Sequence, residues 1–420
     1  MSGHDLRRTL DAVWRMQSPG LIARLARMLG DVGVAEELAQ DTLVTALERW
    51  PLDGIPDNPA AWLMTTGQRR AIDRLRQRQL HASKHAALSH EPGYEGVVMP
   101  DHERWVEDDI GDDLLRLVFV SCHPLLPADA RVALTLRLLG GLSTAEIARA
   151  FLQPEPTIAQ RIVRAKRTLA SAQVPFEVPR RADWGPRLAS VLEVLYLVFN
   201  EGYAASAGDD WMRPVLCEEA LRLGRVLAGL LPAEPEVSGL LALMELQASR
   251  IHARTDAGGN PVLLPGQDRA RWDWLQIARG EAALRQAARL GGQDGPYALQ
   301  AAIAACHARA RRAEDTDWAA IAALYARLAR VQPSPVVELN RAVAVSRAHG
   351  AAAGWEVLAT LDDEPRLRDY APLAAARGDL LQQLGRLDEA RAEFERAATL
   401  AGNAREQGHL LARARACATG

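Results

Sequence analysis

The sequence has no run of about 20 consecutive apolar residues, and its opening stretch, MSGHDLRRTLDAVWRM, lacks the apolar segment of a signal peptide. We therefore expect a cytoplasmic protein with no membrane contact. The 420 residues are 48% hydrophobic and 25% charged. This composition excludes wholesale disorder and gives the chain enough length for two or three domains with their own cores.

Cysteines are few and widely spaced: Cys122, Cys217, Cys306 and Cys417 form no CxxC pair. This spacing predicts neither a disulfide framework nor a zinc site. The sequence also lacks the phosphate-binding GxxxxGK, the dinucleotide-binding GxGxxG, the metal-binding HExxH and a nucleophile elbow. We expect no catalytic residues, no cofactor, no bound metal and no enzymatic activity.

Lysine is almost absent, with only Lys84 and Lys166, so arginine supplies nearly all the positive charge. The net charge of −3 conceals strong local differences. Residues 69–78 carry five arginines against one aspartate, and residues 157–167 carry four cations and no acid. Residues 101–113 instead carry seven acids and one arginine. Two basic helices of this kind are suited to binding a polyanion, which responds to local potential.

Apolar residues recur at helical spacing through almost the whole chain, and no run alternates as a half-buried strand does. The pattern predicts an all-α protein. Breaks in periodicity and charge divide it into a first helical domain at 1–80, a linker at 81–109, a second helical domain at 110–172 and a helical C-terminal region at 173–420.

The second domain contains a predicted helix-turn-helix. Ser143 and Glu146 have the spacing of a capping box, so we expect one helix to begin at Ser143. Pro154 and Pro156 end it. Thr157 and Gln160 repeat the capping-box spacing, which predicts a second helix whose apolar stripe and basic face are typical of a DNA-recognition helix. The stripe consists of Ile158, Ile162, Ala165 and Leu169. A solvated helical hairpin is the alternative.

The first domain contains two predicted helices of different character. In AEELAQDTLVTALERW, residues 35–50, we expect Leu38 and Leu47 to face the core with the alanines and Trp50, and an acidic face to point outward. Such a face suits a protein partner better than DNA. Asn58 as N-cap and Pro59 as first helical residue open the next helix, which ends strongly basic.

These residues carry a resemblance to a known family. AEELAQDTLVTALERW followed by NPAAWLMTTGQRRAIDRLR resembles region 2 of the extracytoplasmic-function (ECF) group of sigma-70 factors. Residues 114–169, from LLRLVFVSCHPLL to IVRAKRTL, resemble their region 4. LYLVFNEGY, GPYALQAAIAACHA and PSPVVELNRAVAV resemble a subgroup with a long helical C-terminal extension. The resemblance covers essentially the whole chain.

The resemblance implies specific roles for individual residues. The first region 2 helix is expected to bind core RNA polymerase, and its candidate residues are Glu37, Gln40, Asp41, Val44 and Glu48. The loop at 50–58 and the next helix are expected to bind the minus-10 element of promoter DNA, and their candidates are Asp57, Asn58, Trp62, Arg69, Arg70 and Arg74. The helix at 157–169 is expected to bind the minus-35 element through Thr157, Gln160, Arg161, Arg164, Lys166 and Arg167.

Two of these positions need separate comment. Trp62 is equally compatible with a core position and with a platform for base stacking. Arg70 stands near a place where the family often has asparagine, so the chain departs from the family pattern there.

The C-terminal region contains one clear repeat. Residues 371–404 fit the 34-residue tetratricopeptide (TPR) template, with small or aromatic residues at its packing positions. These are Gly378, Gly385, Ala390, Phe394 and Ala397. Because an isolated repeat cannot bury its apolar face, we expect stacked helical pairs across the region. They serve either as a regulatory surface, for a protein partner or for an intramolecular contact, or as a scaffold.

The sequence thus predicts an alternative sigma factor with core RNA polymerase and promoter DNA as partners. Two other interpretations remain open: a helical-repeat adaptor whose helix-turn-helix is structural, and an operator-binding regulator that acts without polymerase. The acidic outward face within residues 36–48 favours the sigma factor, because an operator-binding protein has no use for it.

Overall fold

The computed structural model describes residues 3–89, 109–151, 153–180, 182–204, 212–256, 258–402 and 404–418. Across these residues the fold is helical, with short 3-10 turns and a single isolated bridge between Thr255 and Pro261 as the only β-type pairing. This confirms the all-α prediction. The chain divides into two units, Met1–Val194 and Leu195–Gly420, and each is described by itself.

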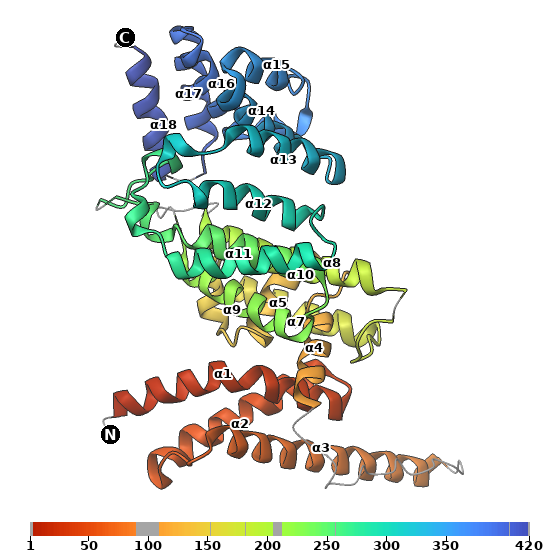
Figure 1. Cartoon of the computed structure of the whole chain (residues 1–420). Helices are drawn as coiled ribbons and strands as arrows, with labels where there is room; N and C mark the ends of the chain where they lie inside the picture. Colours follow the sequence, from red (N-terminus) through yellow and green to blue (C-terminus); the bar gives the residue numbers. More distant parts are fainter. Residues whose placement is uncertain are drawn as a thin grey trace. The chain divides into compact units, whose positions relative to one another are not determined.

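The first unit begins with three helices that pack on one another, α1 (Gly3–Leu29), α2 (Val32–Asp53) and α3 (Pro59–Ser89), drawn from red to orange in Figure 1. Their core includes Leu21, Leu25 and Leu63, each at most 2% exposed. Asn58 Oδ1 accepts a hydrogen bond from the Ala61 amide at 3.0 Å, which confirms the predicted N-cap. Helix α3 continues to Ser89, nine residues into the segment predicted as a linker; residues 90–108 of that segment lie outside the described residues.

Four further helices form the second part of this unit: α4 (Asp109–Ser121), α5 (Ala128–Leu138), α6 (Thr144–Ala150) and α7 (Glu155–Ser171). The capping box of α6 is present, because the Glu146 amide donates to Ser143 Oγ and the Ser143 amide donates to Glu146 Oε2. The predicted apolar stripe of α7 is buried, with each of its four residues at most 5% exposed. Both predictions are confirmed.

The predicted start of α7 is wrong. The helix begins at Glu155 with Pro154 as N-cap, and no side chain caps its first turn. Pro156 lies inside that first turn. The backbone amides of a first helical turn have no carbonyl partner within the helix, so proline, which has no amide hydrogen, loses no hydrogen bond there. The capping box expected at Thr157 therefore does not form.

The first half of α8 (Trp184–Tyr203) also belongs to the first unit. Arg187 Nη2 donates to the Phe119 carbonyl at 2.8 Å, and Ser190 Oγ donates to the Cys122 carbonyl at 2.6 Å. Glu193 forms an ion pair with Arg131 of α5 at 2.9 Å. These contacts fix the start of α8 on α4 and α5.

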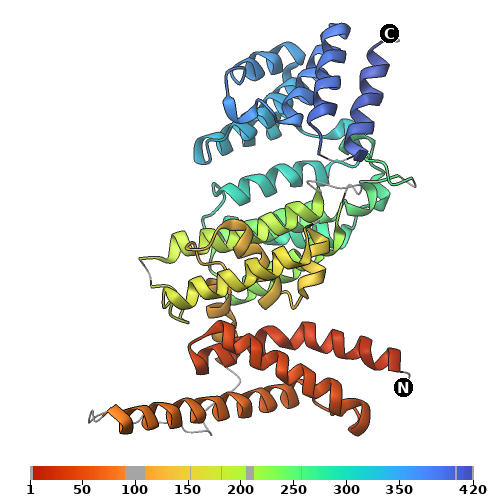
Figure 2. The ribbon, with the colours of Figure 1, turned by 180° about the vertical axis from the view of Figure 1, so that it is seen from behind.

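The second unit is a succession of helices that pack mainly on helices one or two places away in the sequence and are drawn from yellow-green to blue in Figures 1 and 2. After the second half of α8 come α9 (Pro214–Leu230), α10 (Pro235–Ala248), α11 (Trp274–Arg289), α12 (Pro296–Arg309), α13 (Trp318–Val331), α14 (Pro335–His349), α15 (Ala351–Ala359), α16 (Ala371–Gln383), α17 (Leu387–Leu400) and α18 (Ala404–Cys417). Small apolar clusters, each shared by consecutive helices, replace one large core. This is the organisation of a helical-repeat protein.

The predicted TPR-like repeat corresponds to α16 and α17. A Cβ atom on Gly378 would lie 2.7 Å from Cε1 of Phe394, so the two helices approach closely only because residue 378 is glycine. Gly385 turns the chain between them at φ +77°, a region that glycine adopts without strain. Ala390, Phe394 and Ala397 are fully buried. In the part of the chain that the structure describes, no helix is long and apolar enough to cross a membrane.

Candidate nucleic-acid interface

The exposed side of α2 combines acids with apolar residues. Glu37, Asp41, Val44 and Glu48 are exposed, and Gln40 is half-buried. Leu47 is 41% exposed, so its predicted core position is wrong. Thr42 takes the buried position instead, where its hydroxyl donates to the Leu38 carbonyl at 2.7 Å. An acidic face with exposed valine and leucine has the character of a surface for a protein partner.

Arg70 connects α3 to this face of α2. Its Nη2 atom donates to Thr45 Oγ1 at 2.6 Å, and its Nη1 atom lies 3.8 Å from Asp41 Oδ2. The predicted minus-10 residue is therefore hydrogen-bonded to the helix predicted to bind polymerase. Arg69 and Arg74 are exposed on the same helix and form no ion pair among the described residues.

The two tryptophans at the α2–α3 loop pack edge to face, with ring centroids 5.4 Å apart. Trp50 is 2% exposed, and its indole nitrogen is buried without a hydrogen-bond partner. Trp62 is half-buried and packs against Trp50. The Trp62 side chain is thus part of the domain packing and keeps part of its ring accessible. Asp57 and Asn58 are exposed. Sequence reasoning missed Leu52, which is 85% exposed beside this loop.

Helix α7 presents the predicted polar face to solvent. Thr157, Gln160, Arg164 and Arg167 are exposed. Arg161 is held by an ion pair with Asp129 of α5 at 2.9 Å. Val163, which sequence reasoning missed, is 42% exposed on the same helix, where a branched apolar side chain suits contact with a thymine methyl group.

Lys166 differs from the other cations of α7, because it is paired with α2. Its Nζ atom lies 2.8 Å from Glu36 Oε2, and Arg137 Nε of α5 lies 2.6 Å from Glu36 Oε1. Glu36 is 4% exposed. Burial by itself raises the pKa of this carboxyl, but Lys166 and Arg137 together hold the pKa below its ordinary value. The carboxylate is therefore charged at neutral pH and joins the two predicted binding domains.

A second buried acid strengthens this junction. Asp113 of α4 is 1% exposed and contacts three arginines: Arg116 at 2.6 Å, Arg24 of α1 at 3.2 Å and Arg27 of α1 at 3.4 Å. Asp113 belongs to the acidic segment at 101–113. At least one negative charge of that segment is therefore paired with arginines inside the fold. Neither Glu36 nor Asp113 was predicted as a contact residue.

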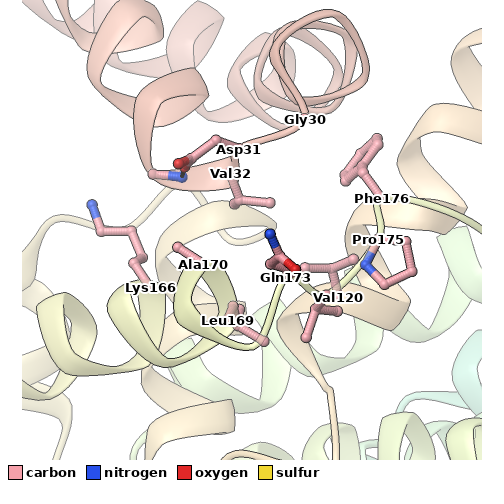
Figure 3. A pocket seen from close by; sticks show the side chains of 12 residues that line it. Gly30, Asp31, Val32, Val120, Lys166, Leu169, Ala170, Gln173, Pro175 and Phe176 are labelled. Carbon is pink, nitrogen blue, oxygen red and sulfur yellow. Dashed lines mark hydrogen bonds between the residues drawn. The ribbon is translucent and has the colours of Figure 1, made fainter.

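A cleft of about 350 Å³ lies beside the Glu36 contact. Figure 3 shows its walls: Gly30, Asp31 and Val32 from the α1–α2 turn on one side, and Lys166, Leu169 and Ala170 of α7 on the other. Gln173 and Phe176, from the chain after α7, also line it. The end of the predicted recognition helix is thus part of an internal contact of the first unit.

The described residues contain no group of three or more histidine, cysteine, aspartate or glutamate side chains arranged to hold a metal ion. The polar side chains of the α2, α3 and α7 surfaces are suited to binding, because they are exposed and carry opposite charges on different helices. None of them is a nucleophilic side chain next to a general base and a third, orienting group, which a catalytic site of that kind would need.

Three stretches of the chain match known families. Residues 14–81 match sigma-70 region 2, and residues 116–169 match sigma-70 region 4. Residues 187–288 match a family of unknown function, DUF6596, and this stretch runs from near the start of α8 to near the end of α11. No solved structure matches the chain.

Similar proteins match either nearly the whole chain or a part of it. An uncharacterized protein of Rhizobium meliloti is 46% identical over 397 residues, which cover 93% of this chain and 92% of that protein. The ECF RNA polymerase sigma factor SigK of Mycobacterium ulcerans is 32% identical over 156 residues, 36% of this chain and 76% of SigK. A probable ECF sigma factor SigI of Mycobacterium tuberculosis is 28% identical over 178 residues, 42% of this chain and 59% of SigI.

Proposed function

Because this chain belongs to the ECF family of sigma-70 RNA polymerase sigma factors, we propose that its three exposed surfaces divide the work of promoter recognition. It is an alternative sigma factor that directs transcription initiation, and core RNA polymerase and promoter DNA are its partners. The observation that carries the proposal is the separation of charge: acids on α2, arginines on α3 and α7. Its place of action is the cytoplasm, and it contributes binding rather than catalysis.

The exposed face of α2 is the proposed core-binding surface. Glu37, Asp41 and Glu48 supply negative charge, and Val44 and Leu47 supply apolar area at 50% and 41% exposure. The acidic side chains attract a basic partner surface during association, and the apolar side chains supply surface that is removed from water when the complex forms. Gln40 lies on the edge of this face, where its Nε2 atom is 3.4 Å from Glu36 Oε1.

The α2–α3 loop and the start of α3 form the proposed minus-10 surface. Opening a promoter requires bases to leave the stack, which costs a few kcal/mol per base and is offset by stacking on apolar or aromatic side chains. Trp62 offers part of its ring and Leu52 its whole side chain for this purpose. Arg69 and Arg74 follow on α3 for contact with phosphates.

The α7 face is the proposed minus-35 surface, and it cannot act together with the minus-10 surface while Lys166 is paired with Glu36. The two elements are centred roughly 25 base pairs apart, or roughly 85 Å along B-DNA. Helix α2 has 22 residues and spans only ~33 Å, so it cannot separate Asn58 from α7 by that distance. The Glu36 contact must therefore break when both elements are bound.

The core-binding proposal predicts a large effect of reversing one charge on α2. Asp41→Arg should weaken binding to core RNA polymerase by roughly tenfold, because it places a cation where a basic partner surface approaches. Asp41 is 59% exposed, so its replacement leaves the core packing intact. A fluorescence titration with core enzyme measures the affinity.

Asp73→Arg is the matched control. Asp73 is 69% exposed on α3, and its replacement by arginine makes the same change of charge in the same domain. Equal affinities of the two variants, with unchanged circular dichroism, would remove α2 from the proposal.

We also infer that the helical-repeat unit regulates the first unit or binds a regulatory protein, because it makes up more than half of the chain and consists of stacked helical pairs. A chain ending at Ala204 tests this better than one ending near Ala172, since it keeps Arg187, Ser190 and Glu193 on region 4. Promoter-dependent transcription should differ at least several-fold between this chain and the full-length protein, both verified as folded. Equal transcription and equal core affinity would make the unit a scaffold.

A further inference from the structure

The second unit contains a cavity that the promoter-binding surfaces do not use. It has a volume of about 480 Å³ and lies among α8, α10, α12, α13 and α14. Every residue that lines it belongs to the unit Leu195–Gly420. Cavities of this size commonly hold small organic molecules, with an apolar lining and a few polar groups that fix orientation.

The charge of the lining is one-sided. Among the described residues it contains no aspartate or glutamate, and its one arginine, Arg250, lies two residues after the end of α10. Arg250 forms no ion pair among the described residues; its guanidinium lies 5.9 Å from the centroid of the Tyr203 ring. An arginine without a carboxylate partner at a cavity wall is a ready partner for an anion, which its planar fork can bind through two hydrogen bonds.

The other titratable groups of the lining are neutral at physiological pH. Burial, together with Arg250 and Arg269, lowers the pKa of His307 to about 4. Burial raises the pKa of Tyr325 to about 12. Arg250 is therefore the charged side chain among the described residues that line the cavity near neutral pH.

One polar atom of the lining has no partner. Gln247 Oε1 is buried and accepts no hydrogen bond, although a buried amide oxygen without a donor costs about 1–3 kcal/mol. Gln300 shows the contrast, because its Oε1 accepts from the Tyr196 hydroxyl at 3.1 Å and its Nε2 donates to the Pro296 carbonyl at 3.2 Å. Gln247 lies in the last turn of α10 and Arg250 two residues beyond that helix, and both line the cavity.

The remaining wall is apolar. Leu243, Ile303 and Leu328 line the cavity and are at most 7% exposed, so they offer a fixed surface to a hydrocarbon or aromatic body. A ligand that makes all three kinds of contact has an anionic group, a hydrogen-bond donor and an apolar frame.

We propose that this cavity is a binding site for a small hydroxycarboxylic acid with an apolar body, whose carboxylate pairs with Arg250 and whose hydroxyl donates to Gln247 Oε1. This proposal is independent of the proposed function, because binding of a ligand to the cavity is measured without polymerase or DNA.

Calorimetric titration of the full chain with three matched probes tests the site. 4-Hydroxybenzoate has the acid, the hydroxyl and an aromatic frame, whereas 4-hydroxybenzamide lacks the charge and benzoate lacks the hydroxyl. We expect 4-hydroxybenzoate to bind at least tenfold more tightly than either analogue. Failure of all three to bind at millimolar concentration, or equal binding of the acid and the amide, would overturn the proposal.

Variants then assign the contacts. Arg250→Gln should reduce affinity for the acid at least tenfold and leave the weak binding of the amide unchanged, and Gln247→Leu should abolish the difference between 4-hydroxybenzoate and benzoate. Arg330→Gln is the control, because Arg330 is exposed on α13 and does not line the cavity. A loss with Arg330→Gln as large as that with Arg250→Gln would contradict a specific carboxylate contact.

Discussion

Glu36→Gln is expected to open the contact between α2 and α7. Glutamine keeps the size of the side chain but leaves Lys166 and Arg137 facing each other without the carboxylate they share. Removing one partner of a buried ion pair costs about 3–5 kcal/mol. If the two domains separate on promoter binding, as proposed, this cost should appear as opening of the junction rather than as unfolding of either domain.

Two measurements follow this opening. Amide hydrogen exchange should accelerate in α2 and at the end of α7, and the affinity of the free protein for promoter DNA that carries both elements should rise roughly tenfold or more, because the population able to bind both elements together increases. Glu37→Gln provides the matched control, since Glu37 is the exposed neighbour of Glu36 and loses the same charge. If both variants behave like the natural protein, the Glu36 contact does not restrain α7.

The same contact should respond to acid. The folded pKa of Glu36 is lowered from its ordinary value of 4.5, so the stabilisation from its ion pairs is fully present above that value. It is lost as the pH falls through the folded pKa, below 4.5. Hydrogen exchange of α7 should therefore be independent of this carboxyl between pH 5 and 8.

Arg164→Ala should weaken minus-35 binding by about 1–3 kcal/mol, or roughly 5- to 150-fold, on the preferred sequence. Arg164 is exposed in the middle of α7, and its long side chain would reach base edges if this helix enters the major groove as proposed. Arg167, nearly one turn further along, is expected to meet phosphate. Its replacement by alanine should weaken binding equally on preferred and scrambled duplexes and reduce the dependence on salt.

Titration of both duplexes with each variant separates the two roles, and Thr168→Ala, an exposed change on the same helix, serves as the control. An Arg164→Ala variant that binds both duplexes as the natural protein does would contradict recognition by this face.

The sequence predicts this fold well wherever the determining interactions are local. Ser143 and Glu146 are three residues apart, so the start of α6 can be read directly. The start of α7 cannot, because Pro156 is compatible both with a turn and with a first helical turn. The predicted core position of Leu47 is wrong, because the buried side of α2 passes through Thr42, Ala46 and Trp50 and leaves Leu47 41% exposed.

The junction could not be predicted in this way. Glu36 contacts Arg137 and Lys166, which lie 101 and 130 residues away in sequence, and the pattern of α2 marks Glu36 as one more surface acid. Four residues of the predicted polar face of α7 are exposed, but the pattern could not distinguish Arg161 and Lys166, which are paired inside the fold, from these neighbours. Only packing of the two domains shows that Lys166 is already paired.

Reconstituted transcription is the most direct test of the account. Core RNA polymerase, a candidate promoter and the full-length protein should give initiation at one position, and core enzyme alone should give none. Changes in the minus-10 or minus-35 element should each abolish it. Tight binding of the protein alone to the duplex, with no promoter-specific transcript when core enzyme is added, would contradict a sigma factor and would instead indicate an operator-binding regulator.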